Sequence, residues 1–171
     1  MVKRPDDRVV DEVWRALAGV HDPEIPPCAI TDLGIVEDVR VSDDAVIEVD
    51  LLPTFAGCPA LDVIREDCET AVAAAVPGHD VRVRFAVSPP WTSDRITPAG
   101  REALRTYGVA PASGDEPRGC PFCGSRNTLQ ESQFGPTLCR ATHYCEACRN
   151  PFEAFKPKLI ALTPRATPRR G

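Results

Sequence analysis

Residues 45–72 read AVIEVDLLPTFAGCPALDVIREDCETAV and carry the signals of a strand, a loop and a helix. Branched apolar residues dominate 45–52, as they do in buried strands. Proline suits the first position of a helix, so we expect a helix that begins at Cys58-Pro59. Its apolar residues recur every three or four positions until Pro77-Gly78 ends it, and they are Leu61, Ile64, Cys68 and Val72. The stretch therefore predicts a strand followed directly by a helix, with Cys58 at the positive end of that helix.

On the N-terminal side we expect a second strand and a first helix. Residues 33–41 are also rich in branched apolar side chains, and Ser42-Asp43-Asp44 between the two strands favours a β-hairpin. Residues 7–20 show an apolar stripe at helical spacing, made of Val10, Val13, Trp14 and Leu17. The prolines within residues 22–27 stop this helix, because proline removes a hydrogen-bond donor and restricts the residue before it. We expect a rigid, extended loop there.

On the C-terminal side we expect a third strand and a short helix. Apolar residues alternate with other residues over 81–87, and Thr97-Pro98 is typical of the start of a helix, which should reach Tyr107. The fold class is therefore α+β, with the element order αββαβ and a short extra helix. We predict four segments: a domain over 1–107, a linker over 108–119, a cysteine-rich module over 120–158 and a Pro/Arg-rich tail over 159–171.

Composition and charge limit the location and the partners. The chain has 171 residues, of which 43% are apolar and 26% charged, as in ordinary globular proteins. It contains neither an apolar run long enough to span a bilayer nor the beginning of a signal peptide, so we expect a cytoplasmic protein with no membrane partner. Residues 1–107 carry a net charge of −9 and residues 108–171 one of +4. This distribution argues against nucleic acid as a partner of the acidic part and leaves only the basic part as a candidate, which its small net charge disfavours.

Five of the eight cysteines lie between Cys120 and Cys148. In a reducing compartment, close pairs of cysteines are metal ligands or redox groups more often than disulfides. Two Cys-x-x-Cys pairs separated by 21 residues have the spacing of a zinc ribbon, in which four thiolates hold one tetrahedral ion. The predicted cofactor is structural Zn²⁺, bound by Cys120, Cys123, Cys145 and Cys148. The metal should supply much of the folding free energy of so small a module.

Alternatives to this interpretation stay open. The same cysteines could hold iron or an iron–sulfur cluster. A redox dithiol is disfavoured, because Cys120-Pro121-Phe122-Cys123 lacks the preceding strand and following helix of such a site. Cys139 could be an extra metal ligand or a small buried apolar residue. His143 could also bind the metal, although four thiolates already saturate the ion.

Cys58 is the most informative residue outside the module. At a helix N-terminus the dipole and the free amide groups favour a thiolate, so we expect a lowered pKa and a nucleophile or a ligand for a soft metal. A buried structural cysteine is the alternative. Asp22 and Glu24 flank Pro23 and could present two carboxylates on a rigid loop, whereas ordinary turn chemistry would also explain them.

Four motifs occur in an order and spacing that resembles the SufT-like family of iron–sulfur assembly factors. They are Asp22-Pro23-Glu24-Ile25-Pro26, Asp32-Leu33-Gly34-Ile35-Val36, Thr54-x-x-x-Cys58-Pro59 and Pro90-Trp91-Thr92. Together with the cysteine pairs, two further motifs resemble the family of accessory proteins of the phenylacetyl-CoA epoxidase (ring-1,2-oxygenase) system of aerobic phenylacetate degradation. These are Ser132-x-Phe134-Gly135-x-Thr137-x-Cys139 and Pro151-Phe152-x-x-Phe155-Lys156.

The resemblance implies an assembly factor for metal centres in client enzymes, without turnover of its own and without catalytic residues. Cys58 would be the thiol that handles transient iron or an iron–sulfur cluster, and Asp22, Glu24 and Thr54 would line its pocket. The implied partners are subunits of the epoxidase, especially its iron–sulfur flavin reductase component. A structural or docking subunit of the oxygenase complex is the alternative. Cys28 and Cys68 match no motif, and we assign Cys68 to the core and leave Cys28 unassigned.

Overall fold

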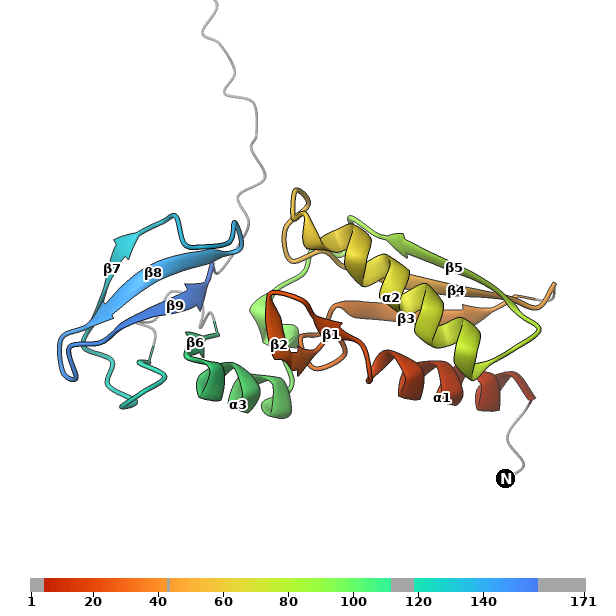
Figure 1. Ribbon diagram of the computed structural model, residues 1–171, viewed down its shortest axis with the longest axis horizontal. Coiled ribbons are helices and arrows are strands. Elements are labelled where there is room, and N and C mark those ends of the chain that lie inside the picture. Colours follow the sequence, from red (N-terminus) through yellow and green to blue (C-terminus); the bar gives the residue numbers. More distant parts are fainter. Residues whose placement is uncertain (1–4, 43, 112–118, 157–171) are drawn as a thin grey trace, which may run out of the picture.

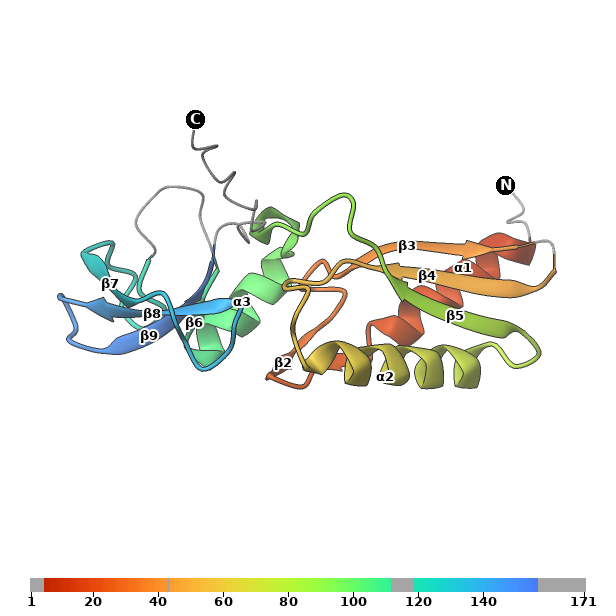
Figure 2. The ribbon, with the colours of Figure 1, turned by 90° about the horizontal axis from the view of Figure 1, so that it is seen from above.

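The computed structural model describes residues 5–42, 44–111 and 119–156, and it has an α+β architecture in two parts. The body contains the elements α1 to α3, and the ribbon contains the strands β6 to β9. The two parts lie next to each other along the long axis of the molecule (Figures 1 and 2). No helix in these described ranges is long and apolar enough to cross a membrane.

The sheet of the body has the strand order β3-β4-β5. Strands β3 (Val36–Val41) and β4 (Val46–Leu51) pair antiparallel, which confirms the predicted hairpin. Strand β5 (Asp80–Phe85) pairs parallel to β4, and α2 (Ala60–Ala75) makes the crossover between these two strands. A parallel pair needs such a crossover, and the stretch at residues 45–72 supplies it.

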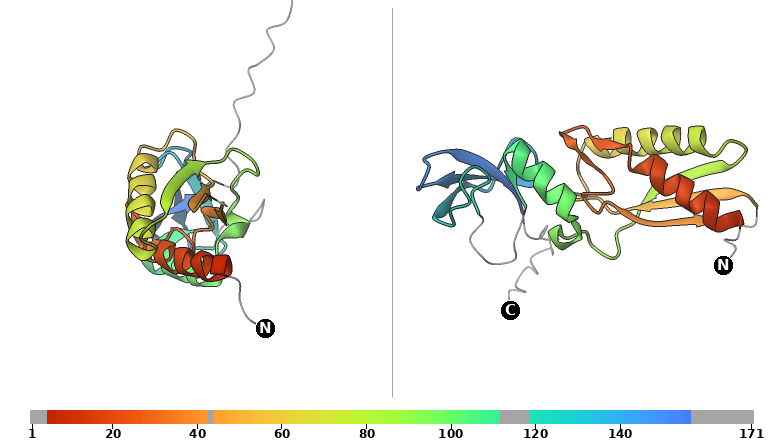
Figure 3. Two further views of the ribbon diagram at one scale, coloured as in Figure 1. Left: turned by 90° about the vertical axis from the view of Figure 1, so that its right-hand side faces the viewer. Right: turned by 90° about the horizontal axis from the view of Figure 1, so that it is seen from below.

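The two faces of this sheet differ in chemistry because side chains alternate along a strand. Ile47, Val49 and Leu51 are fully buried in the core, where α1 (Pro5–Leu17) packs on β3 and α2 packs on β5 (Figure 3). On the alternate positions of the sheet, Asp50 accepts hydrogen bonds from Arg40 (2.7 Å) and from Arg84. The body is therefore a two-layer unit with helices on one face of its sheet.

Three helix boundaries differ from the expected ones, and the first is the start of α1 at Pro5 rather than at Asp7. Helix α1 ends at Leu17 rather than at Val20, because tighter i→i+3 bonds replace the helical ladder around Gly19. Helix α2 begins at Ala60, after Pro59 as its N-cap, so Cys58 precedes the helix instead of opening it. The segment predicted as an extended loop forms a small antiparallel pair of strands, β1 (His21–Asp22) and β2 (Ile25–Ala29).

A short 3-10 helix, η1 (Ser93–Arg95), and α3 (Pro98–Tyr107) complete the body. Helix α3 begins where the sequence predicts, since Thr97 accepts a hydrogen bond from the Gly100 amide (3.0 Å) and donates one to Asp32 (2.8 Å). A Cβ at position 100 would lie 2.5 Å from the Asp32 carbonyl oxygen, so α3 rests directly on the loop after β2.

The ribbon is a four-stranded sheet in the order β6-β9-β8-β7. Strands β7 (Thr128–Ser132), β8 (Arg140–Cys145) and β9 (Pro151–Phe155) form an antiparallel meander. Strand β6 (Val109–Ala110) pairs parallel to β9 and comes from the segment predicted as the linker. Residues 112–118 of that segment and the predicted tail lie outside the described residues. The sheet of the ribbon thus begins before its first cysteine.

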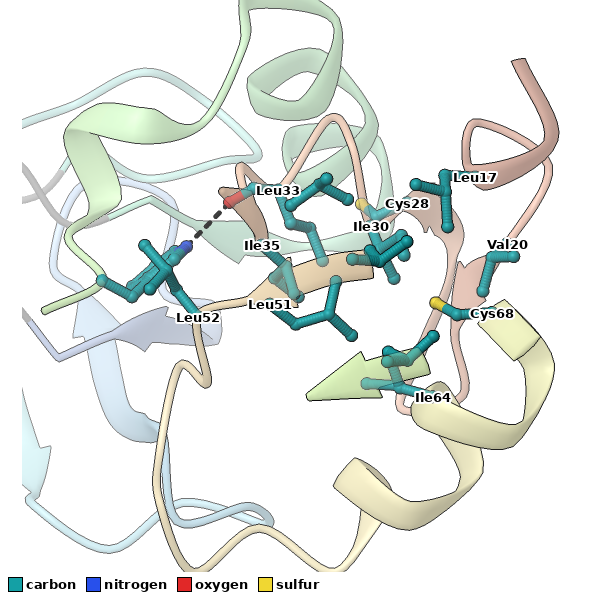
Figure 4. Close-up of a cluster of buried hydrophobic side chains, with 14 of the residues drawn as sticks. Leu17, Val20, Cys28, Ile30, Leu33, Ile35, Leu51, Leu52, Ile64 and Cys68 are labelled. Atoms are coloured by element: carbon teal, nitrogen blue, oxygen red, sulfur yellow. Dashed lines mark hydrogen bonds between the residues drawn. The ribbon is translucent and has the colours of Figure 1, made fainter. Parts of the chain in front are cut away.

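One hydrophobic core extends from the body into the ribbon. Phe155 at the end of β9 and Cys139 belong to the same buried cluster as the core of the body. The Phe155 ring lies 5.6 Å from the Trp91 ring. The Trp91 indole N–H donates to the carbonyl oxygen of Leu33 (2.9 Å), the hydrogen bond drawn as a dashed line at Leu33 in Figure 4. The packing of Phe155 therefore fixes the position of the ribbon on the body.

Replacement of this ring should loosen the joint. Because Phe155 is 2% exposed, we expect Phe155→Ala to lower the free energy of unfolding by about 3–5 kcal/mol. The matched control is Phe134→Ala, since Phe134 belongs to the same part of the molecule but is 80% exposed, and this control should change stability by less than about 1 kcal/mol. Urea denaturation measures both, and equal losses would contradict the assigned role of Phe155.

Candidate functional site

Four cysteines at one end of the ribbon form a cluster suited to a metal ion. The sulfur atoms of Cys120, Cys123, Cys145 and Cys148 all lie within 4.8 Å of one another. The Cys120 and Cys148 sulfurs are 3.6 Å apart, as are those of Cys123 and Cys145. A tetrahedral zinc ion with Zn–S bonds of about 2.3 Å requires sulfur atoms roughly 3.8 Å apart. The cluster is therefore close to the geometry that a Zn²⁺ ion requires, as the spacing of the cysteines predicts.

The two Cys-x-x-Cys turns have the same backbone design. The amide of Gly124 donates to the carbonyl of Cys120, and the amide of Arg149 donates to the carbonyl of Cys145, both at 2.8 Å. Both donor residues have positive φ, 75° at Gly124 and 59° at Arg149. The turns also direct amide groups at the sulfur atoms, as those of Phe122 and Cys123 do toward Cys120. Such hydrogen bonds stabilise the thiolate form that a metal ion needs.

Two charged residues near this cluster in sequence, Arg140 and Lys156, have other partners. Arg140 lies 2.6 Å from a Glu153 carboxylate oxygen and donates to the Thr137 hydroxyl (2.8 Å). Lys156 donates to the carbonyl of Leu138 (2.8 Å). Arg140 and Lys156 therefore bond groups other than the four cysteine sulfurs. His143 is buried and stacks on a neighbouring ring, outside the group of four ligands.

Cys58 lies immediately before α2, in the loop that follows β4. Its sulfur accepts a hydrogen bond from the amide of Ala60, and its own amide donates to the carbonyl of Phe55 (3.1 Å). The side chain is half-buried and packs against the core of the body. Cys58 thus stands at the positive end of the helix, as predicted, although it is not itself helical.

The loop between β1 and β2 brings carboxylates toward this thiol. Asp22 caps the turn, since one of its oxygens accepts hydrogen bonds from the amides of Glu24 (2.8 Å) and Ile25 (3.1 Å). Turn chemistry therefore accounts for one oxygen of Asp22 and leaves its other oxygen for different partners. The charges of both Glu24 and Asp22 act on Cys58, which places the three residues in one electrostatic environment.

The pKa of the Cys58 thiol is raised, which contradicts the lowered pKa expected from its place at a helix. Burial is the largest cause, and the charges of Glu24, Cys139 and Asp22 act in the same direction. The hydrogen bond from Ala60 lowers the pKa but does not compensate. The pocket therefore disfavours a free thiolate, and a cation would favour one.

Cys139 reaches the same region from the ribbon. It is 8% exposed, lies in the core cluster shared with the body and stands outside the four-cysteine group. Its pKa is also raised, by burial first, with Glu24 and Asp22 acting in the same direction. Burial also raises the pKa of Asp22, and the neighbouring Arg140 offsets part of the rise in the pKa of both Asp22 and Cys139, a role that nothing in the local sequence indicates. The prediction that Cys139 is a fifth ligand of the ribbon metal is not supported.

The remaining candidate residues are two buried core cysteines, Cys68 and Cys28, and the half-buried Thr54. Cys68 is fully buried in α2, which confirms that it belongs to the core, and burial raises its pKa to about 12. Cys28 is also fully buried in the core, and burial raises its pKa to about 11 (Figure 4). Thr54 is half-buried in the loop that carries Cys58, and its contribution to the pocket stays a prediction.

Two protein-family models match the chain. The model described as an iron-sulfur cluster assembly protein matches residues 10–85, and the model of the PaaD zinc beta ribbon domain matches residues 106–156. A solved structure is similar to the body: a domain of unknown function, DUF59, from Bacillus anthracis, with a TM-score of 0.54 and 26% identity, covers 58% of this chain and 93% of its own. These matches confirm the α+β fold class and the zinc-ribbon prediction.

Two relatives match different lengths of the chain. This chain is 38% identical over 158 residues to a protein of Escherichia coli strain K12 that is named as a putative subunit of 1,2-phenylacetyl-CoA epoxidase. The match covers 86% of this chain and 92% of that protein. The chain is 36% identical over 85 residues to the "Fe-S protein maturation auxiliary factor SufT" of Staphylococcus aureus strain USA300, covering 50% of this chain and 96% of that protein. Both resemblances predicted from the motifs are confirmed.

Removal of the metal should unfold the ribbon. We expect the purified chain to contain about one zinc ion per molecule, because four thiolates complete one tetrahedral site. Treatment with a chelator should release that ion and abolish the hydrogen-exchange protection of β7 to β9, while α2 stays protected. Elemental analysis and hydrogen exchange measure the two effects. Protected ribbon strands in zinc-free protein would contradict a structural role for the metal.

The pH dependence of alkylation should report the environment of Cys58. Because its pKa is raised, the rate of its reaction with iodoacetamide should reach half of its maximum above the free-cysteine value of about 8.5. Glu24→Gln removes a negative charge that raises this pKa, so the midpoint should shift to lower pH. Glu66→Gln, on the exposed surface of α2, should leave it unchanged. Mass spectrometry follows the reaction, and a midpoint below about 8.5 in the unmodified chain would refute the expectation.

Proposed function

The chain belongs to the PaaD family, and from this premise we propose that it is an accessory protein for maturation of the iron–sulfur or iron centres of the phenylacetyl-CoA epoxidase complex in aerobic phenylacetate degradation. The proposal combines two matches. One relative is named as a subunit of that epoxidase, and the relatives that match the body alone are named as maturation factors for Fe-S proteins.

The observation that carries the proposal is the combination of one thiol and two carboxylates around the start of α2. A thiolate is a good ligand for iron, and carboxylates can bind the same ion. Burial and the charges of Glu24 and Asp22 disfavour the free Cys58 thiolate, so the pocket suits a positively charged cargo better than it suits nucleophilic catalysis. The cargo is iron or an iron–sulfur cluster that the protein holds transiently and passes on.

The proposed role needs no reaction cycle of the protein's own. The acceptor would be a subunit of the epoxidase, and we infer that its iron–sulfur flavin reductase component is the main client, because a protein with an iron–sulfur cluster is the one that requires this kind of cargo. The metal cluster of the ribbon is a separate, structural element, since its four sulfur ligands already complete a tetrahedral site.

A second candidate is a docking subunit of the oxygenase complex. The name of the Escherichia coli relative favours it, and so does the exposed apolar surface of the ribbon, where Phe134 is 80% and Leu138 is 51% exposed. This alternative predicts co-purification with active oxygenase at a fixed stoichiometry. It also predicts epoxidase activity that does not depend on Cys58.

The deciding experiment uses cells that lack this protein and receive variants of it. With Cys58→Ser, the iron content and the activity of the purified epoxidase should fall to the values of cells without the protein, because the proposed cargo ligand is lost. The control variant is Cys68→Ala, which removes a fully buried thiol on α2 and should support normal maturation. Iron analysis and activity assays are made on the same epoxidase preparations. Normal iron and activity with Cys58→Ser would refute the proposal and favour the docking subunit.

A further inference from the structure

The four cysteines of the metal cluster differ in exposure. Cys123 is exposed and Cys148 is half-buried, whereas Cys120 is 3% exposed and Cys145 is fully buried. Residues 120–123 and 145–148 form two Cys-x-x-Cys turns, which we call the first and the second knuckle. A metal-bound cysteine is a thiolate, and a thiolate reacts with oxidants more readily when it is exposed. An oxidant in solution therefore reaches the cluster through Cys123.

Each sulfur of the first knuckle is in contact with one sulfur of the second. The Cys123 and Cys145 sulfurs are 3.6 Å apart, and so are those of Cys120 and Cys148. A disulfide bond is about 2.05 Å long, so the two sulfurs of a pair have to move about 1.5 Å closer to form one. The exposed Cys123 thus has the fully buried Cys145 beside it. This is the arrangement of a cysteine that is oxidised first and a second cysteine that completes the disulfide.

The surroundings of these sulfur atoms favour an uncharged product. Cys148 packs against a small hydrophobic cluster of the ribbon, whose members are Ala110, Cys120, Cys145, Phe152 and Ala154. Thiolates left there without a metal ion would be buried charges, which are unfavourable in apolar surroundings. A disulfide carries no charge, so the same apolar neighbours accommodate it. The packing of the ribbon is therefore compatible with oxidation of the cluster and loss of its ion.

A disulfide between the knuckles is favoured over one within a knuckle. The two cysteines of a knuckle are three positions apart in sequence, whereas Cys123 and Cys145 are 22 apart and Cys120 and Cys148 are 28 apart. A cross-link restricts the unfolded chain more when it closes a longer loop. The two bonds between the knuckles also join the same turns that the metal ion joins. They differ from the dithiol of Cys120 and Cys123 that the sequence disfavours.

We propose that the four-cysteine cluster is a peroxide-sensitive modification site, at which Cys123–Cys145 and Cys120–Cys148 become disulfides between the knuckles and the zinc ion is released. The oxidant is a small peroxide, which has access to the exposed Cys123. The ribbon then exchanges a metal cross-link for a covalent one. This inference goes beyond the proposed function, since it concerns the ribbon alone and does not involve Cys58.

The reaction takes two electrons from each pair of thiolates. The Cys123 sulfur attacks one oxygen of the peroxide, the O–O bond breaks, and the other oxygen leaves as hydroxide. The Cys145 sulfur then attacks the resulting sulfenic acid, forms the disulfide and expels the remaining oxygen as a second hydroxide. A second peroxide oxidises Cys120 and Cys148 in the same way. The four sulfurs no longer carry the charge that binds the ion, so two peroxides are consumed for each zinc ion released.

The modification is confined to one end of the ribbon. Cys145 is the last residue of β8, whereas Arg140 is its first residue and pairs with Phe155 at the joint with the body. The cluster and the joint therefore lie at opposite ends of β8. The body should keep its structure when the cluster is oxidised, and hydrogen exchange in α2 should stay unchanged.

Zinc release and disulfide mapping in the full-length, zinc-loaded protein test this proposal. Two equivalents of hydrogen peroxide should release about one zinc ion per chain, which a colorimetric metal indicator measures. Mass spectrometry of the alkylated and digested protein should find the cross-links Cys123–Cys145 and Cys120–Cys148. A thiol reductant with added zinc should restore the starting protein. The matched control is Cys139→Ala, which removes the ribbon thiol outside the cluster and should release zinc to the same extent.

Three results would overturn the proposal. The first is zinc that stays bound while thiols elsewhere in the chain consume the peroxide. The second is a disulfide within one knuckle, such as Cys120–Cys123, in place of the bonds between the knuckles. The third is oxidation of Cys123 to an acid that the thiol reductant does not reverse. The proposed function is judged separately, by the iron content of the epoxidase from cells with Cys58→Ser.

Discussion

The contact between Phe155 and Trp91 is the interaction on which the arrangement of the molecule depends. Trp91 is anchored in the body by its hydrogen bond to Leu33, and Phe155 is the last residue of the last ribbon strand. Because the two rings belong to one buried cluster, the ribbon is held against the body rather than tethered to it. Cys139 belongs to the same core cluster, against which Cys58 also packs. The packing that joins the two parts therefore also positions the polar residues beside it.

Most of the fold could be predicted because its signals are local. The hairpin of β3 and β4 follows from two apolar runs around a turn, α2 follows from a proline and one apolar face, and the metal cluster follows from the spacing of two cysteine pairs. Strands β1, β2 and β6 escaped prediction, and two of them, β1 and β6, have only two residues each. Such short strands exist only because a partner elsewhere in the chain offers hydrogen bonds, and no local pattern encodes that partner.

In the candidate site, too, features with a local sequence signal could be predicted, and features that depend on distant residues could not. The place of Cys58 before a helix could be read from Pro59, since capping rules act over a few residues. The raised pKa of its thiol could not be predicted from the sequence. Burial and the charges of Glu24 and Asp22 raise this pKa by more than the hydrogen bond from the Ala60 amide lowers it, and those carboxylates come from the β1–β2 strand pair. Asp22 has two tasks, a turn cap and a charge in the pocket, whereas its sequence context indicates only the first. Helix rules predict the environment of a thiol only where tertiary neighbours are weak.

The parallel pairing of β6 with β9 changes what counts as a separable piece of this protein. Val109 and Ala110 are each 2% exposed, and they sit in the ribbon sheet although they follow α3 almost directly, through Gly108 with φ 88°. The composition of the chain assigns these residues to a linker over 108–119, yet a cut at the end of that linker would remove an edge strand from the ribbon and open its small core. An exchange of ribbons between related proteins, whether by recombination or by engineering, therefore has its natural junction at Gly108, between the end of α3 and the start of β6. The segment that begins at Val109 has to be kept with the metal-binding part in any such exchange.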